Sequence, residues 1–126
     1  MKAVKIMVMD DEEIVRNITR SQLSVLGHDV VLVEDGEQAI NRYQKSQESN
    51  MPVDLVILDL TIPGGMGGEE AAAKILQIDP KAKIIVASGY SNDPVMANYR
   101  EYGFASSLTK PFDLDGLRKS IESALS

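Results

Sequence analysis

Five short apolar runs, each followed by a longer segment with helical periodicity, limit the fold of this chain more than any other feature of its sequence. Strands that are buried on both faces read as continuous apolar runs rich in Val and Ile. The runs span residues 4–9, 30–33, 53–58, 83–87 and 105–108. Alternation of such runs with helical segments is typical of a parallel sheet covered by helices on both faces. We therefore predict an α/β fold with one doubly wound, five-stranded parallel sheet.

The segments between the apolar runs carry helix signals at their ends. Gly27 lies where the first helix should stop. Asp93 and Pro94 supply a cap and a proline at the first helical position, and Asp113 can cap the last helix. That last segment has leucine and isoleucine at spacings of three and four residues, which gives one apolar face. We predict five helices, over residues 12–26, 36–47, 68–78, 94–102 and 114–125.

Length and charge exclude several classes of function. The 126 residues contain no linker or low-complexity tract, so we expect one domain over residues 1–126. A net charge of -6 argues against direct nucleic-acid binding, which uses a basic surface to neutralise phosphates. No apolar run approaches the roughly 20 residues that cross a bilayer, and residues 1–10 do not resemble a signal peptide. We expect no membrane insertion by this domain and a cytoplasmic location, and the absence of cysteine is compatible with a reducing compartment.

Polar residues with useful chemistry follow four of the apolar runs: Asp10 and Asp11, then Asp59, Ser88 and Lys110. In doubly wound folds, ligands bind at the edge where the carboxyl ends of the strands meet. Carboxylates that crowd together there repel one another unless an ammonium group or a cation relieves them. Their oxygen atoms suit a hard cation such as Mg²⁺. Lys110 could then balance the charge of an incoming anion, and Ser88 could donate a hydrogen bond to it.

Each of these residues also has a purely structural interpretation. Asp11 could cap the first helix, Asp59 and Ser88 could begin turns, and Lys110 could be one more solvated lysine. The structural interpretations are less convincing when taken together, because all of them would have to apply to residues at the same edge of one sheet. We interpret the glycine-rich residues 64–68 as a flexible loop beside Asp59, since they contain no nucleotide-binding motif. His28 has no cysteine or second histidine nearby, so we place it in a surface turn without a function.

Four short motifs resemble those of receiver domains in bacterial response regulators and hybrid histidine kinases. They are Met-Asp-Asp-Glu at 9–12, Ile-Leu-Asp-Leu at 57–60 with Ile-Pro at 62–63, Ala-Ser-Gly-Tyr at 87–90, and Thr-Lys-Pro-Phe at 109–112. The resemblance covers nearly the whole chain. It implies a flavodoxin-like fold with strand order 2-1-3-4-5 and a cis bond between Lys110 and Pro111.

The resemblance implies a phosphoacceptor of a two-component phosphorelay, which receives its phosphoryl group from a histidine kinase or a phosphotransfer protein. The implied roles are Asp59 as phosphoacceptor, Ser88 as switching hydroxyl, Lys110 as the cation on the phosphoryl oxygens, and Asp10, Asp11, Asp59 and the Thr61 backbone carbonyl as Mg²⁺ ligands. Such a domain is not an enzyme in the usual sense. It catalyses only its own phosphoryl transfer and slow autodephosphorylation.

The sequence departs from the usual receiver pattern in three places. The loop at 63–68 is one residue longer and lacks Asp-Gly, and Thr61 and Tyr90 stand where the family tunes the phosphoryl lifetime. Ser107, three residues before Lys110, stands where many receivers have Tyr or Phe, so we expect no aromatic switch. The loop and residues 88–94 look most like receivers of hybrid sensor kinases. Both a stand-alone receiver and a module of a longer protein fit the sequence.

Two other classes of protein are also compatible with some of these residues. A haloacid dehalogenase-type, Mg²⁺-dependent phosphohydrolase also uses an aspartate at a strand end. Such enzymes have an Asp-x-Asp motif, whereas this chain has Thr61 in place of the second aspartate. A flavodoxin-like electron carrier would bind a flavin phosphate after the first strand. The acidic residues 10–13 would repel that phosphate. Neither alternative explains the site as well as a receiver does.

Overall fold

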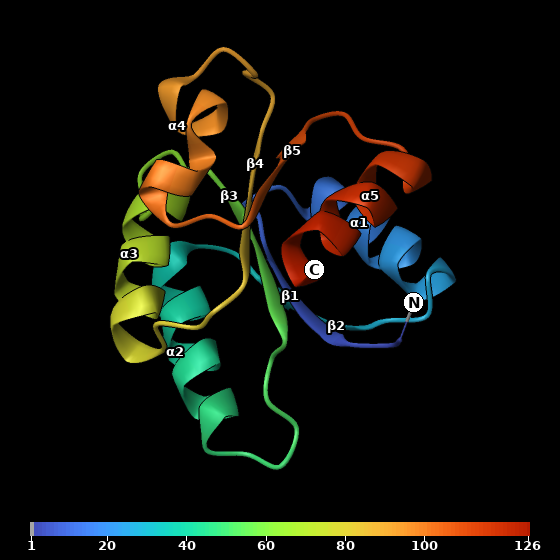
Figure 1. Ribbon diagram of the computed structural model, residues 1–126, viewed down its shortest axis with the longest axis vertical. Coiled ribbons are helices and arrows are strands. Elements are labelled where there is room, and N and C mark those ends of the chain that lie inside the picture. Colours follow the sequence, from blue (N-terminus) through green and yellow to red (C-terminus); the bar gives the residue numbers. More distant parts are fainter. Residues whose placement is uncertain (1) are drawn as a thin grey trace.

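A single parallel sheet of five strands runs through the centre of the computed structural model, which describes residues 2–126 (Figure 1). The strands are β1 (Lys5–Met9), β2 (Asp29–Val33), β3 (Leu55–Asp59), β4 (Ile84–Ser88) and β5 (Ser106–Thr109). Their order is β2-β1-β3-β4-β5, and every neighbouring pair is parallel. The predicted doubly wound fold and its strand order are confirmed.

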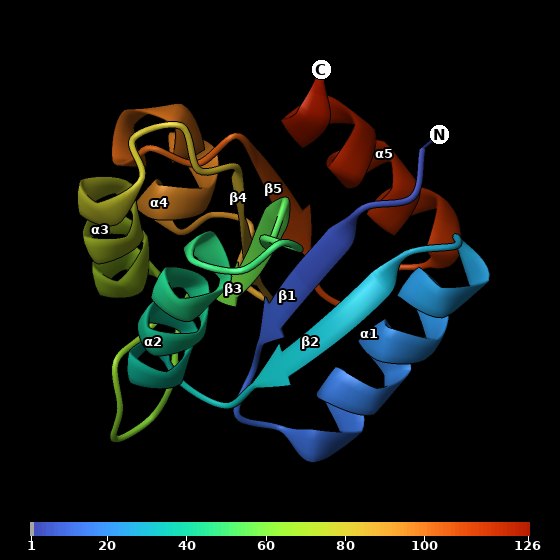
Figure 2. The same cartoon turned by 90° about the horizontal axis from the view of Figure 1, so that it is seen from below.

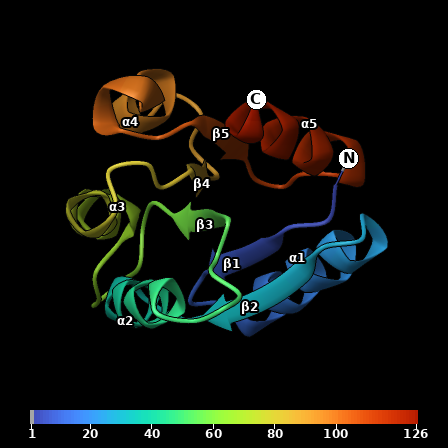
Figure 3. The same ribbon diagram turned by 60° about the horizontal axis from the view of Figure 1, so that its bottom comes forward.

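Helices cover both faces of this sheet, as Figures 1 and 2 show. They are α1 (Glu13–Val25), α2 (Gly36–Gln47), α3 (Gly68–Ile78), α4 (Pro94–Ala97) and α5 (Leu114–Leu125), with a 3₁₀ helix, η1, at Tyr99–Tyr102. In Figure 3, α1 and α5 lie on one side of the sheet, and α2, α3 and α4 lie on the other. Within residues 2–126, no helix has both the length and the apolar character that a bilayer-spanning segment requires.

Successive side chains of the central strands enter two different hydrophobic cores. In β1, Ile6 and Val8 pack in the core beneath α1 and α5, whereas Met7 and Met9 pack in the core beneath α2 and α3. All four side chains are buried. Because a strand sends alternate side chains to opposite faces, a strand between two helical layers must be apolar at every position. This requirement explains the continuous apolar runs of the sequence.

The fourth predicted helix, over residues 94–102, is interrupted. Its α-helical part ends at Ala97, and the chain continues as the 3₁₀ helix η1. Asn98 lies between the two with φ -123° and ψ 41°, outside the helical region, and its Nδ2 donates to the Pro94 carbonyl at 3.1 Å. Side-chain bonding to a nearby carbonyl is the way in which asparagine competes with helical hydrogen bonding. Gly103, with φ +89°, then ends the segment.

His28 is buried, contrary to the predicted surface turn, and only 5% of it is exposed. The cause is the way in which α1 ends. The N–H of Gly27 donates to Ser24 O at 3.0 Å and the N–H of His28 donates to Leu23 O at 3.0 Å, which is the Schellman arrangement that turns the second residue after the cap back onto the helix. The imidazole Nδ1 then accepts a hydrogen bond from Val4 N at 3.1 Å.

Burial lowers the pKa of His28 from its ordinary value of 6.5. The folded state therefore prefers the neutral imidazole, and its contribution to stability is present above about pH 6.5 and lost as the pH falls toward the lowered value. We expect urea unfolding to show a larger loss of stability between pH 7.5 and pH 5.5 in the wild type than in His28→Asn, which keeps an acceptor for Val4 N. Equal losses in the two proteins would contradict this assignment.

Candidate functional site

The predicted polar residues lie together at the carboxyl edge of the sheet. Asp10 directly follows β1, Lys110 directly follows β5, and Asp59 and Ser88 are the last residues of β3 and β4. Pairing of the strands aligns them, because Asp59 is opposite Ala87 and Ser88 is opposite Thr109. The Lys110 N–H also donates to Ser88 O at 2.8 Å. The sheet register thus fixes where these side chains begin.

Lys110 reaches across this edge to two carboxylates. Its Nζ lies 2.5 Å from Asp10 Oδ2 and 3.3 Å from Asp59 Oδ2. Asp10 and Asp59 are nearly buried, with 2% and 8% of each residue exposed. Attraction between charges is stronger where water is excluded, so this ammonium group offsets much of the repulsion between the two acids.

The environment changes the protonation equilibria of two of these groups. Burial raises the pKa of the Asp59 carboxyl above its ordinary value of 3.8, while the charge of Lys110 opposes that rise and the charge of Asp10 adds to it. For Lys110, burial favours a lower pKa, but the hydrogen bond to Asp10 and the charges of both acids outweigh it and raise the pKa above 10.5. Lys110 is therefore positively charged at neutral pH.

The carboxylate oxygens of Asp10 make shorter hydrogen bonds than those of Asp59. Asp10 Oδ1 accepts from Glu12 N at 2.9 Å, and Asp10 Oδ2 accepts from Lys110 at 2.5 Å. Asp59 has longer contacts, with Thr61 N at 3.4 Å from Oδ1 and Lys110 Nζ at 3.3 Å from Oδ2. A carboxylate with weak contacts and a raised pKa has the more available lone pairs. Asp59 is the better placed nucleophile of the two.

The residues at this edge fit a hard cation. Carboxylate oxygens of Asp10, Asp11 and Glu12 can all lie within 4.8 Å of one another. The donors are oxygen atoms only, and the acids beside them outnumber the single ammonium group of Lys110, so a divalent cation would reduce the excess negative charge. Sequence reasoning assigned Glu12 only to the start of α1. The run of three acidic residues after β1 is the sequence feature that could have placed Glu12 in this cluster.

The Ser88 hydroxyl is buried, and it accepts a hydrogen bond from the backbone N–H of Tyr90 at 3.1 Å. Ser88 Oγ is thus bonded to the start of the loop that leads to α4. Thr61 is exposed and follows Asp59 by two residues, and its contact with Asp59 uses the backbone N–H. The Thr61 backbone thus lies beside the Asp59 carboxylate, and Ser88 ends the strand next to β3.

The glycine-rich loop between β3 and α3, which the sequence predicted to be flexible, is anchored at residues 66–68. Gly36 N donates to Met66 O at 2.9 Å, and Met66 packs so closely on Gly36 that a Cβ there would lie 2.6 Å from Met66 Cγ. Gly67 and Gly68 bring the loop onto the end of β3, since added Cβ atoms would lie 2.5 Å from Leu60 O and 2.7 Å from Asp59 O. Glycine is needed there for close approach of two backbones.

Arg16 is a further residue of the site that sequence reasoning missed. Its Nη1 donates to the Asp10 backbone carbonyl at 2.7 Å, and its Nη2 lies 3.7 Å from Glu34 Oε1. The side chain thereby ties the end of β1 to the end of β2. Its place in the first turn of α1 gave no sign of this contact, which depends on how α1 packs against the sheet.

Comparison with known proteins gives a consistent result. The family model of the response regulator receiver domain matches residues 6–122. The chain is 31% identical over 124 residues to the chemotaxis protein CheY of Bacillus subtilis, covering 98% of each chain. It is 28% identical over 121 residues to the sporulation initiation phosphotransferase F of the same organism, covering 96% of this chain and 93% of the relative.

Solved structures agree. The response regulator TrrA of Thermotoga maritima, solved in complex with Mg²⁺-BeF, has a TM-score of 0.81 and 29% identity, covering 96% of this chain and 98% of TrrA. The receiver domain of the sensor histidine kinase PA1611 of Pseudomonas aeruginosa shares the fold, with a TM-score of 0.83, 23% identity and coverage of 99% and 100%. The chain thus resembles response regulators more than it resembles the receiver domains of sensor kinases.

Receiver domains are signalling modules that accept a phosphoryl group from histidine kinases on an aspartate with Mg²⁺, and the haloacid dehalogenase alternative is not favoured. The cis bond between Lys110 and Pro111, which the resemblance implied, is present. Because the family model matches almost the whole sequence, this chain belongs to the response regulator receiver domains of two-component systems.

Proposed function

We propose that Asp59 is the phosphoacceptor of this receiver domain. The observation that carries the proposal is the position of Lys110, whose ammonium group lies 2.5 Å from Asp10 and 3.3 Å from Asp59 at the ends of three strands. This arrangement puts a fixed positive charge beside the less engaged carboxylate. A phosphoryl group that arrives on Asp59 would therefore meet a cation already in place.

The proposed reaction forms one bond and breaks one. An Asp59 carboxylate oxygen attacks the phosphorus atom of a donor phosphohistidine, the new P–O bond forms, and the P–N bond breaks with its electron pair going to the imidazole. Lys110 stays charged and shifts its hydrogen bonds from the acids to the phosphoryl oxygens. The Ser88 hydroxyl can donate a hydrogen bond to one of those oxygens, and the Thr61 N–H already lies near Asp59 Oδ1.

We assign Mg²⁺ to Asp10, Asp11, Asp59 and the Thr61 backbone carbonyl. When bound there, Mg²⁺ supplies positive charge that balances the acids and the transferred phosphoryl group. The chain's own residues do the rest: Asp10 holds Lys110, and Arg16 holds the backbone of Asp10. In this proposal the domain is a cytoplasmic signalling module that catalyses only its own phosphorylation and slow dephosphorylation.

The phosphodonor protein must approach the surface around Lys110 in order to reach Asp59. Beside Lys110 lies an apolar hollow of about 350 Å³, lined by Val15, Ile18, Thr19, Gln22, Lys110, Pro111 and Phe112. Ile14 and Ile18 on α1 are exposed although they are apolar, with Ile18 54% exposed. An apolar surface next to the reacting group is typical of a protein contact. We propose that the histidine kinase or phosphotransfer protein docks here.

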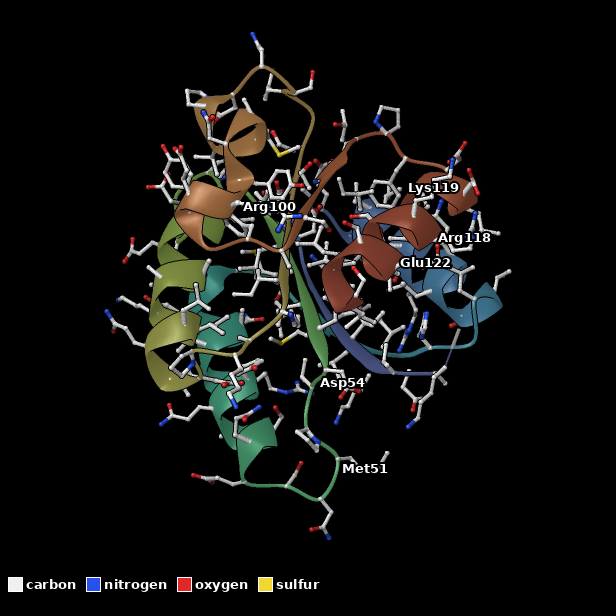
Figure 4. All side chains as sticks on the ribbon, viewed as in Figure 1. Met51, Asp54, Arg100, Arg118, Lys119 and Glu122 are labelled. Carbon is white, nitrogen blue, oxygen red and sulfur yellow. The ribbon has the colours of Figure 1, made fainter. Side chains whose placement is uncertain are left out.

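Asp59→Asn should abolish phosphorylation by acetyl phosphate with Mg²⁺, because an amide cannot act as the nucleophile. The measurement is intact mass and the site of the acid-stable, base-labile phosphate. Asp54→Asn is the matched control, since Asp54 precedes the opposite end of β3 (Figure 4) and accepts a hydrogen bond from Lys5 N that an asparagine can also accept. Labelling of Asp59→Asn at the wild-type level would show that the acceptor is another residue.

Asp11→Ala should weaken Mg²⁺ binding by about tenfold or more, because one charged ligand is lost. The fold should survive, since the change also relieves repulsion among the acids. Calorimetric titration with Mg²⁺ measures the affinity, and thermal unfolding checks the fold. Asp29→Ala removes an exposed acid at the other end of the sheet and controls for net charge. Unchanged affinity in Asp11→Ala would remove Asp11 from the metal site.

Ile18→Lys should slow phosphoryl transfer from a phosphorylated histidine kinase by about tenfold or more, because a central apolar contact is replaced by a charge. Labelling by acetyl phosphate should stay at the wild-type rate. Val25→Lys is the matched control, since Val25 is 72% exposed on the same helix but lies at its far end from Lys110. If Ile18→Lys and Val25→Lys are equally efficient acceptors from the kinase, the donor does not dock at the hollow.

A further inference from the structure

Three serine residues join β5 to α5 through hydrogen bonds that are buried or partly buried. Ser120 Oγ donates to the backbone carbonyl of Ser107 at 3.0 Å. Ser106 Oγ lies 2.9 Å from both the hydroxyl and the backbone carbonyl of Ser120. The Ser106 and Ser120 side chains are buried. Ser106 Oγ donates to the Ser120 carbonyl and Ser120 Oγ donates to the Ser107 carbonyl, and in the contact between the two hydroxyls either atom can be the donor.

This contact differs from the usual behaviour of serine in a helix, where the hydroxyl bonds to a carbonyl of the preceding turn. Here the hydroxyl of α5 bonds to the backbone of a neighbouring strand. Separating α5 from β5 would break the hydrogen bond between the Ser120 hydroxyl and the Ser107 carbonyl. The same face of the helix carries Leu117 and Ile121, which share a hydrophobic core with Leu108 of β5.

The other side of α5 makes its own ion pairs and does not depend on the sheet. Arg118 lies 3.0 Å from Glu122, and Lys119 lies 3.2 Å from Asp115. Figure 4 shows Arg118, Lys119 and Glu122 on the α5 ribbon. These pairs lie within one helix, so they move with it. The polar attachment of α5 to β5 therefore runs through the three serines.

The segment before β5 is held in a different way. The Tyr90 N–H donates to Ser88 Oγ at 3.1 Å, and the α-helix that follows has only four residues, Pro94–Ala97. A phosphoryl group on Asp59 would attract the Ser88 hydroxyl by a charge-assisted hydrogen bond, and the Tyr90 N–H would then lose its acceptor. A short helix with few hydrogen bonds is a region of low local stability.

We propose that Ser106, Ser107 and Ser120 form a latch that fixes α5 on β5, so that the response to phosphorylation is directed into residues 89–104. The proposal rests on the assignment of Asp59 as phosphoacceptor. It agrees with the small side chain of Ser107, which offers no ring that could rotate at this place in β5. The surface that changes on activation is then formed by the α4 and η1 segment, while the surface of α5 stays the same.

Hydrogen exchange followed by mass spectrometry tests the latch, with Mg²⁺ and beryllium fluoride as the phosphoryl mimic. In the wild type, the mimic should change exchange in residues 89–104 and change it less than about twofold in residues 114–125. In Ser120→Ala, the change should spread to residues 114–125 and reach about fivefold, as expected for the loss of one buried hydrogen bond. Ser123→Ala, an exposed serine on the same helix, should behave like the wild type.

Three results would overturn the latch. One is a change in hydrogen exchange in residues 114–125 of the wild type that is as large as the change in residues 89–104. This comparison needs no variant. Another is a Ser120→Ala protein that binds the mimic but shows the wild-type pattern. Ser120→Cys, a smaller change of volume and a weaker donor, gives the same comparison if Ser120→Ala does not fold. The third is a wild type that does not bind the mimic, which alone would also contradict the assignment of Asp59.

Discussion

The ion pairs of Lys110 with Asp10 and Asp59 are the interaction on which the site depends, because two nearly buried carboxylates cannot lie side by side without a neighbouring positive charge. A buried charge that loses its partner is strongly destabilising, whereas the complete set is tolerated. The three charged groups come from three different strands. The sheet must therefore hold β1, β3 and β5 in register for the charges to balance, and the apolar cores on both faces provide that rigidity.

Much of this arrangement could be predicted from the sequence. The carboxyl ends of parallel strands meet at one edge, so residues that directly follow apolar runs can be placed together without knowing any contact. That reasoning placed Asp10, Asp59, Ser88 and Lys110 correctly at the edge. It also found the caps at Asp93 and Asp113, because a capping side chain acts on its own helix within three residues.

The features that sequence reasoning missed depend on residues far apart in the chain. Burial of His28 requires the end of α1 to meet the backbone of Val4, and the anchored loop requires Met66 to rest on Gly36. Arg16 acts on Asp10 only because α1 packs against β1. Each of these contacts is set by the shape of the packed chain, which local patterns do not encode. The glycine cluster suggested freedom of movement, but Gly67 and Gly68 are glycines because the backbone of β3 is so close.

The two helical layers also separate the tasks of the domain in space. α1, with the apolar hollow beside Lys110, belongs to one face of the sheet, and α4 with η1 belongs to the other. The carboxylates of Asp10 and Asp59 lie at the carboxyl edge of the sheet, between the two faces. In the proposed docking mode, substitutions on α1 change which donor is recognised without altering the residues that respond to it. For a lineage that duplicates and rewires its signalling proteins, input and output can diverge independently around an unchanged chemical centre.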